Sequence, residues 1–162
     1  MPESHYPVYL EICADREAVH FTAALLFDEG VYEEIGQFCT RSPTDIEAHL
    51  RAFDDGSLQG GQLHWAIRDR NTHACFGSLQ ATMNLDGCIS IGYRVRSESQ
   101  DRGIATEALR LLIKELNLKF PERALVASVD DPQNAASRRV LAKCGFRANS
   151  IGTKWTYQER HD

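Results

Sequence analysis

The sequence lacks the features that mark several protein classes. No apolar stretch approaches the roughly 20 residues of a membrane-spanning helix. Residues 1–5 show no basic start, and no apolar core follows as in a signal peptide, so we expect a cytoplasmic protein without a membrane partner. The five cysteines form no Cys-x-x-Cys pair, which favours reduced thiols and argues against a zinc site. They are Cys13, Cys39, Cys75, Cys88 and Cys144.

Basic residues are scarce in the first 60 positions. Residues 1–60 hold twelve acidic and three basic residues, a net charge of −9, whereas the rest holds eleven acidic and fifteen basic residues, a net charge of +4. Two explanations of this asymmetry stay open. The charges belong to a solvated surface, or the basic half faces an anionic cofactor and the acidic half faces a cationic acceptor. No basic stripe is present, which disfavours nucleic acid as a partner.

Length and pattern predict one mixed α/β domain. With 162 residues, of which 43% are hydrophobic and 25% are charged, the chain is expected to fold as a single domain over residues 1–162. The predicted order is strand, helices, antiparallel meander, helix, strand, helix and closing hairpin. The expected strands cover residues 8–13, 62–69, 74–83, 88–95, 124–129, 146–150 and 154–159. The expected helices cover residues 15–27, 42–56, 104–119 and 134–145, with a short helix and loop in residues 28–41.

The stretch from Ile89 to Leu112 organises the rest of the chain. Apolar and polar or small residues alternate from Ile89 to Val95, as in a half-buried strand. From Ile104, apolar residues recur at spacings of three and four, as in a helix. Gly103 stands in the polar turn at the start of this helix. Because the first N–H groups of a helix have no internal partner and the helix dipole is positive there, the turn predicts an anion site.

This turn matches neither of the common nucleotide-binding motifs. It reads Gln-x-x-Gly-x-Ala from Gln100 to Ala105, and it lacks both the Gly-Lys-Ser/Thr of an ATP-binding loop and the three-glycine dinucleotide fingerprint. Arg102 adds a charge that can pair with phosphate. A second strand and helix follow, with Asn134 at the start of the helix and Gly145 at its end.

Three ordered motifs make the chain similar to acetyl-CoA-dependent N-acetyltransferases of the GNAT superfamily. Within it, the chain resembles the RimJ/RimL-like branch, which includes ribosomal-protein N-terminal acetyltransferases. The resemblance implies the GNAT fold, a mixed and mostly antiparallel sheet of about 6–7 strands flanked by helices. The motifs are Ile91-Gly92-Tyr93, Gln100-x-x-Gly103-x-Ala105-Thr106-Glu107-Ala108, and Asn134-x-x-Ser137-x-x-x-Leu141-x-Lys143-x-Gly145-Phe146.

The same resemblance implies direct transfer of an acetyl group from the co-substrate acetyl-CoA to a primary amine in a ternary complex, without a metal. The parallel strands over residues 88–95 and 124–129 would splay apart and hold the pantetheine arm between them. Backbone groups of Val95 and Arg96 would bind the arm, and the Val95 N–H would polarise the thioester carbonyl. The turn would hold the pyrophosphate through a cofactor-binding set made of Gln100, Asp101, Arg102, Gly103, Ile104, Ala105 and Thr106.

Two residues of the second helix complete the implied cofactor site. Asn134 would form a hydrogen bond with the pantetheine arm, although it can equally serve as the cap of its helix. Lys143 would lie near the cofactor, although a solvated cation in the last turn of a helix is favoured by the dipole alone.

The catalytic groups are less clear, because the sequence departs from the family at two positions. Leu141 stands where many members carry a tyrosine acid, and Ser90 stands where many RimJ/RimL-like members carry a glutamate. Ser137, one helical turn after Asn134, is the candidate general acid; its structural alternative is a helix serine bonded to a preceding carbonyl. The general base stays unassigned among candidates that include Glu34, His64, Tyr93 and Glu159.

Several functional alternatives stay open. The two departures also fit a non-catalytic acyl-CoA-binding sensor with a degenerate active site. Within the enzyme interpretation, the acceptor is a protein N-terminus, a polyamine, an amino acid or an aminoglycoside, and the oligomeric state is a monomer or a homodimer. Trp65, Trp155 and Tyr157 are able to wall an acceptor cleft, but aromatic residues of strands more often lie in a core.

Overall fold

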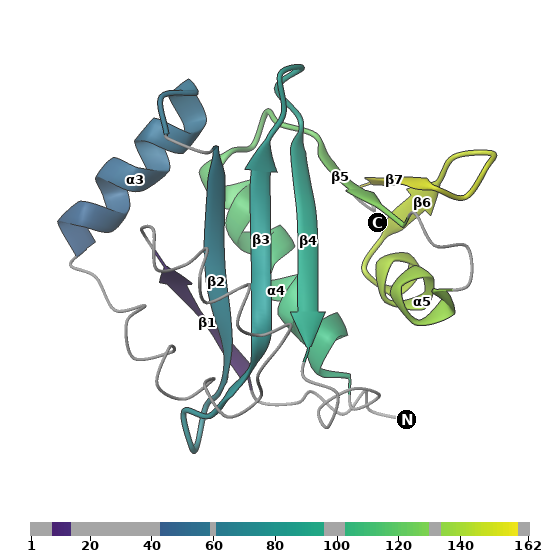
Figure 1. Cartoon of the computed structure of the whole chain (residues 1–162), viewed down its shortest axis with the longest axis horizontal. Helices are drawn as coiled ribbons and strands as arrows, with labels where there is room; N and C mark the ends of the chain where they lie inside the picture. The colour runs from purple at the N-terminus through teal and green to yellow at the C-terminus, as the bar shows by residue number, and fades with distance from the viewer. Residues whose placement is uncertain (1–7, 14–42, 59–60, 96–102, 130–133, 159–162) are drawn as a thin grey trace.

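The computed structural model describes residues 8–13, 43–58, 61–95, 103–129 and 134–158. In this part of the chain, seven strands form one sheet in the order β1-β2-β3-β4-β5-β7-β6 (Figure 1). The strands are β1 (Val8–Cys13), β2 (Gln62–Asp69), β3 (Cys75–Met83), β4 (Ile89–Val95), β5 (Leu125–Ser128), β6 (Phe146–Ala148) and β7 (Lys154–Tyr157). The helices described are α3 (Pro43–Asp55), α4 (Ile104–Lys119) and α5 (Ala135–Lys143).

All neighbouring strands are antiparallel except β4 and β5, which are parallel. The expected mixed and mostly antiparallel sheet flanked by helices is therefore confirmed. The expected boundaries agree with the structure to within two residues, and residues 62–69 and 104–119 agree at both ends. The helix predicted over residues 15–27 and the segment 28–41 lie outside the described residues.

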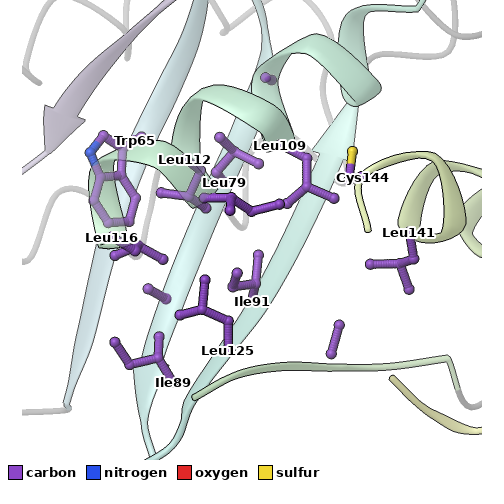
Figure 2. Close-up of a cluster of buried hydrophobic side chains, with 14 of the residues drawn as sticks. Trp65, Leu79, Ile89, Ile91, Leu109, Leu112, Leu116, Leu125, Leu141 and Cys144 are labelled. Atoms are coloured by element: carbon purple, nitrogen blue, oxygen red, sulfur yellow. The ribbon is translucent and has the colours of Figure 1, made fainter. Parts of the chain in front are cut away.

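The core lies between the apolar face of the sheet and α4, which packs against β1, β3 and β4 (Figure 1). Figure 2 shows Leu109, Leu112 and Leu116 of α4 facing Leu79 and Ile91 of the sheet. Each of these five side chains is buried, as expected where a helix covers a half-buried sheet. The buried residues of α4 are Ile104, Ala108, Leu109, Leu112, Ile113 and Leu116.

This buried face of α4 differs from the one expected from sequence spacing. Leu111 and Glu115 fit the apolar spacing from Ile104 but are only half-buried, whereas Leu109 and Ile113 are buried. A helix that lies under several strands buries a wider stripe than a narrow seam of threes and fours. Spacing alone therefore identified the helix but not the centre of its buried face.

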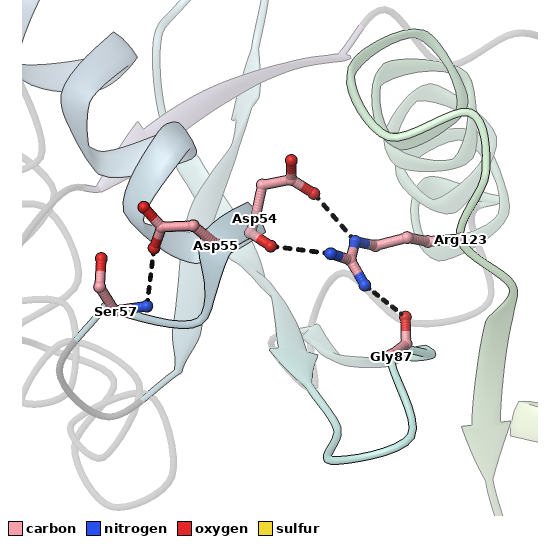
Figure 3. A network of polar contacts seen from close by, with 5 residues as sticks. All are labelled: Asp54, Asp55, Ser57, Gly87 and Arg123. Carbon is pink, nitrogen blue, oxygen red and sulfur yellow. Dashed lines mark hydrogen bonds and ion pairs between the residues drawn. The ribbon is translucent and has the colours of Figure 1, made fainter.

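One arginine ties three separate segments together at the end of the sheet. Arg123 lies between α4 and β5, and its Nε donates to Asp54 Oδ1 at 2.9 Å (Figure 3). Its Nη2 donates to the Asp54 carbonyl at 2.7 Å, and its Nη1 donates to the Gly87 carbonyl at 3.0 Å. The end of α3 and the β3–β4 hairpin are thus held beside the start of β5.

Candidate functional site

The parallel strands β4 and β5 pair only at their beginnings. Ile89 is opposite Leu125 and Ser90 is opposite Val126, with the Ile89 N–H donating to the Ala124 carbonyl at 2.8 Å. β4 then continues to Val95 without a further register pair to β5, which turns away toward β7 (Figure 1). The two parallel strands therefore separate after Ser90 and Val126, as the resemblance implies, and the unpaired side of β4 beyond Ser90 is called the opening below.

The backbone of β4 directs polar groups into this opening. Along a strand, the N–H and C=O groups of successive residues alternate between its two edges. Because the Ile89 N–H points to β5 and the β3–β4 register is regular, the N–H groups of Tyr93 and Val95 also point toward the β5 side. The Val95 N–H therefore points toward the side of β4 on which the sequence interpretation places the pantetheine arm.

The N-terminus of α4 is the second part of the site. Gly103 occupies its N-cap position with φ 76°, a left-handed conformation that glycine adopts without strain. The first helical hydrogen bond described runs from the Glu107 N–H to the Gly103 carbonyl at 3.0 Å. No described side chain caps the amides of Ile104, Ala105 and Thr106. An uncapped helix start with open space in front of its glycine fits a phosphate group.

Four of the predicted cofactor-binding residues lie outside the described part of the chain. They are Arg96, Gln100, Asp101 and Arg102.

A cleft of ≈ 320 Å³ lies between the sheet and the N-terminal end of α5. The strand register explains its composition, because Ser78 lies opposite Arg94 and Gln80 lies opposite Gly92. Gly92 leaves room for the Gln80 side chain, which would lie 3.3 Å from a β-carbon at position 92. The cleft is lined by Ser78, Gln80, Gly92, Tyr93, Arg94 and Asn134, a mainly polar set.

Sequence reasoning did not single out Ser78, Gln80 or Arg94. A signal was present, because Ser78 and Gln80 alternate with the apolar Leu79 and Ala81. Such alternation marks a polar face of a strand, but only the β3–β4 register shows which residue of β4 lies beside each of them.

Asn134 has the capping role expected of it and also borders the cleft. Its Oδ1 accepts from the Ser137 N–H at 3.1 Å, which satisfies one orphan donor of α5. The amide nitrogen of the same side chain makes no hydrogen bond to a described residue. Asn134 therefore retains a donor group at the cleft while it caps α5.

Tyr93 connects β4 to the first turn of α5 across the opening. Its hydroxyl donates to the Ser137 carbonyl at 3.4 Å, so the two candidate catalytic residues lie side by side. Burial raises the pKa of the Tyr93 phenol, and the contact with Ser137 offsets this only in part. The phenol is consequently protonated at neutral pH, which disfavours Tyr93 as a general base.

Other candidates lie away from the cleft. His64 is buried on β2, and Trp65 and Trp155 belong to the core. Tyr157 packs its ring against Phe146 with centroids 5.7 Å apart. The three aromatic residues considered as walls of the cleft are therefore not among its lining residues. The base candidates Glu34 and Glu159 lie outside the described residues.

The two departures from the family also have structural roles. Leu141 is 2% exposed and belongs to the core. The Ser90 hydroxyl accepts from the amide nitrogen of Asn84 at 2.8 Å, which ties it to the β3–β4 hairpin. Lys143 is exposed in the last turn of α5, as expected of a solvated cation.

The described segments contain no group of three or more His, Cys, Asp or Glu side chains arranged to hold a metal ion. No helix among them is both long and apolar enough to cross a membrane.

Comparison with known proteins gives a family match. Residues 1–147 match the family described as Acetyltransferase (GNAT) domain. Probable N-acetyltransferase YjcK of Bacillus subtilis strain 168 is 31% identical over 133 residues, which cover 78% of this chain and 62% of that protein. The chain thus spans about three fifths of the length of this curated relative.

Solved structures share the fold at low identity. RimL, a ribosomal L7/L12 alpha-N-protein acetyltransferase in complex with coenzyme A, is 19% identical with a TM-score of 0.55, over 91% of this chain and 92% of that one. AAC(6')-Ib in complex with ribostamycin and coenzyme A is 14% identical with a TM-score of 0.59, over 94% and 93%. At these identities the likeness concerns the sheet and its helices, not the acceptor.

Proposed function

Because the chain belongs to the GNAT acetyltransferase family, we propose that it transfers an acetyl group from acetyl-CoA to a primary amine by direct attack in a ternary complex. The observation that carries the proposal is the parallel pair β4 and β5, which separates after two register pairs, together with the N-terminus of α4, whose first amides are capped by no described side chain. The opening suits an extended arm, and the helix start suits the phosphates at the end of that arm.

Different residues of the chain bind the pyrophosphate and the pantetheine arm of the co-substrate. Backbone N–H groups of Asp101 to Thr106 hold the pyrophosphate in this proposal, with Arg102 as a counter-charge. Backbone groups of Val95 and Arg96 align the pantetheine arm along β4, and Asn134 donates to it from the start of α5. Lys143 adds positive charge on the last turn of α5.

Acetyl-CoA supplies the acetyl group as a thioester. The Val95 N–H polarises the thioester carbonyl and stabilises negative charge on its oxygen during attack. The amine must arrive neutral. None of the cleft-lining residues that the structure describes is a carboxylate or histidine, so water in the polar cleft takes the proton in this proposal. The sequence proposes the Ser137 hydroxyl as the acid for the departing sulfur.

The acceptor is the less defined part of the proposal. A protein N-terminus, as in the RimJ/RimL-like branch, and a small cationic amine both present the required primary amine. RimL acts on a ribosomal protein, and AAC(6')-Ib is seen with ribostamycin. The three sequence motifs favour the RimJ/RimL-like branch, and we propose membership of it for this chain.

Two glycines provide a matched test of the co-substrate site. Gly103 and Gly56 have φ of 76° and 81°, and a β-carbon on either would meet no atom within 4 Å. Gly103→Glu and Gly56→Glu should therefore carry similar backbone strain, but only the former places a carboxylate at the phosphate site. Acetyl-CoA at 100 times its Kd should stabilise wild type and Gly56→Glu by about 2.7 kcal/mol, and Gly103→Glu much less. Equal shifts in the melting temperature of all three proteins would refute the site.

Release of free CoA thiol with a panel of amines then tests the transfer itself. We expect at least one amine to accelerate thiol release above the rate of hydrolysis in wild type. If acetyl-CoA binds but no amine in the panel accelerates release, the chain is instead the acyl-CoA-binding sensor.

A further inference from the structure

Thioester aminolysis needs a proton at the departing sulfur, and Tyr93, a residue that lines the cleft, carries a hydroxyl beside the first turn of α5. We propose that the Tyr93 phenol, rather than the Ser137 hydroxyl, is the general acid of the acetyl transfer. This inference rests on the proposed function and names a residue of the same site.

The geometry supports Tyr93 in three ways. Its backbone lies on the part of β4 that borders the opening, beyond the last register pair with β5. Its side chain crosses to α5, where the hydroxyl reaches the Ser137 carbonyl at 3.4 Å. The residue also lines the cleft together with Asn134, the N-cap residue of α5. The phenol thus lies between β4 and the first turn of α5, and Tyr93 borders the cleft.

The hydrogen bond to the Ser137 carbonyl leaves the Tyr93 hydroxyl able to rotate toward another acceptor. At 3.4 Å the hydrogen bond is long for an O–H donor, whose usual distance is about 2.7–2.8 Å. The Ser137 carbonyl lies in the first turn of α5 and is also available to an amide of the next turn. The phenol can therefore exchange this partner for a nearby thiolate at small cost, while the carbonyl keeps a helical donor.

Acid strength also favours the phenol over the serine hydroxyl. A phenol has a pKa near 10 and a thiol near 8.5, so proton transfer from tyrosine to a thiolate is uphill by only about 2 kcal/mol at the reference values. An alkyl hydroxyl is a much weaker acid and makes the same step far less favourable. The raised pKa of Tyr93 increases this cost somewhat, but it keeps the phenol protonated throughout the neutral range.

The proposed step balances as follows. The amine lone pair forms the C–N bond, and the C–S bonding pair leaves with the sulfur. The Tyr93 hydroxyl delivers its proton to that sulfur and becomes a phenolate. The nitrogen of the new amide loses its extra proton, and water carries a proton back to the phenolate. The products are the acetylated amine and a free thiol, and Tyr93 returns to its starting form.

Ionisation of a group close to Tyr93 would change the pH dependence of kcat in the same way as ionisation of the phenol, so the titratable neighbours of Tyr93 are considered first. The titratable group that acts on Tyr93 from α5 is the Cys144 thiol, which raises the pKa of the phenol slightly. Glu107 and Arg110 of α4, with Lys143, act in turn on Cys144. Cys144 is neutral below its own pKa of about 11, so it adds no charge in the neutral range.

Three variants separate the possible roles. Tyr93→Phe removes only the hydroxyl and keeps the ring in the core. Ser137→Ala removes the competing hydroxyl and leaves the backbone carbonyl. Tyr9→Phe on β1 is the matched control, because it also deletes a phenol with one hydrogen bond, to His73 Nδ1 at 2.9 Å, away from the cleft. We expect Tyr93→Phe to lower kcat by roughly 10²–10⁴-fold and Tyr9→Phe to keep wild-type kcat. Ser137→Ala, which leaves Tyr93 in place, should lower kcat far less than Tyr93→Phe does.

Binding and pH provide readouts that a structural role would not reproduce. The Kd of acetyl-CoA, measured by calorimetry, should be unchanged in Tyr93→Phe. Incorporation of 3,5-difluorotyrosine at position 93, whose phenol is more acidic, should move the alkaline limb of kcat to lower pH. An alkaline limb that does not move would overturn the acid role.

The remaining outcomes also decide the question. Wild-type kcat in Tyr93→Phe, or a large loss in Ser137→Ala alone, would overturn the proposal while leaving acetyl transfer intact. A Tyr93→Phe protein that loses acetyl-CoA binding would make Tyr93 a spacer between β4 and α5 instead of an acid. A wild-type protein that releases no CoA thiol with any amine would refute the acetyltransferase activity itself, and this result is visible before any variant is made.

Discussion

Gly77 on β3 lies directly opposite Val95 at the end of β4. A β-carbon at position 77 would come within 2.9 Å of the Val95 Cα and would also collide with the Arg94 carbonyl oxygen. The atoms in the way are backbone, which cannot rotate aside as a side chain can. The absence of a side chain at Gly77 therefore fixes the position of the strand end whose N–H we assign to the thioester carbonyl.

Gly77→Ala should consequently disturb both stability and activity. We expect a loss of about 1–3 kcal/mol in the free energy of unfolding from overpacking. We also expect a fall in kcat that exceeds the effect on the KM for acetyl-CoA, because a displaced Val95 N–H stabilises the transition state less. Urea unfolding and steady-state kinetics measure the two effects.

Gly92→Ala is the comparison for stability. Its β-carbon would meet only the Gln80 side chain, at 3.3 Å, and that side chain can move. Its loss of unfolding free energy should therefore be smaller than that of Gly77→Ala. Equal losses in the two variants would mean that the close approach at Val95 is relieved by local motion.

The Arg123 network makes a second prediction, which concerns stability alone. Asp54→Ala removes one exposed ion pair, and such pairs contribute about 0–1 kcal/mol. Arg123→Met removes the ion pair together with the bonds to the Asp54 and Gly87 carbonyls, and we expect a loss of about 1–3 kcal/mol. Chemical denaturation of both variants measures the difference. If Asp54→Ala costs as much as Arg123→Met, the carboxylate and not the backbone bonds holds α3 to the hairpin.

Much of the fold was predictable because its signals are local. Alternation identified β4, and the apolar spacing identified α4. The anion site proposed at Gly103 was also accessible from the sequence, since it depends on a turn and the helix that follows it.

The cleft was harder to predict because it depends on register and side-chain reach. Ser78 and Gln80 became cleft residues only once β3 was paired with β4. The contact between Tyr93 and Ser137 joins residues 44 positions apart, and no spacing rule indicates it. Sequence reasoning therefore reached Ser137 and listed Tyr93 as a base, whereas the buried phenol is suited to donate a proton.

A third prediction concerns pH and the buried thiol of Cys144. Burial raises the pKa of Cys144 to about 11, against about 8.5 for an ordinary thiol. The folded state therefore keeps its proton where the unfolded state loses it. The stabilisation is fully present below pH 8.5 and is lost as the pH rises toward 11, with a total of about 3 kcal/mol.

Urea unfolding of wild type and Cys144→Ala at pH 8 and pH 10.5 isolates this contribution. Lysine and tyrosine titrate in both proteins, so their effects cancel in the difference between the two pH slopes. Wild type should lose more stability than the variant over this interval. Parallel slopes would show that Cys144 ionises as readily in the folded protein as in the unfolded chain.

The last prediction concerns the acceptor and rests on the sequence, because the residues lie outside the described part of the chain. Asp28, Glu29, Glu33 and Glu34 fall within seven positions, and four such charges repel one another unless a cation is near. An acceptor with a second positive charge would supply that cation. Attraction of this kind acts mainly on encounter and KM, and salt screens it over about 8–10 Å.

The measurement is kcat/KM for matched monocationic and dicationic amines at low and high salt. Wild type should prefer the dication at low salt and lose that preference at high salt. The double variant Glu33→Gln/Glu34→Gln should show a weaker preference at low salt, with little change for the monocation. If the dication has no advantage at low salt, or if the double variant keeps the whole advantage, the cluster is a solvated surface. The uneven charge of the first 60 residues would then have no part in acceptor recognition.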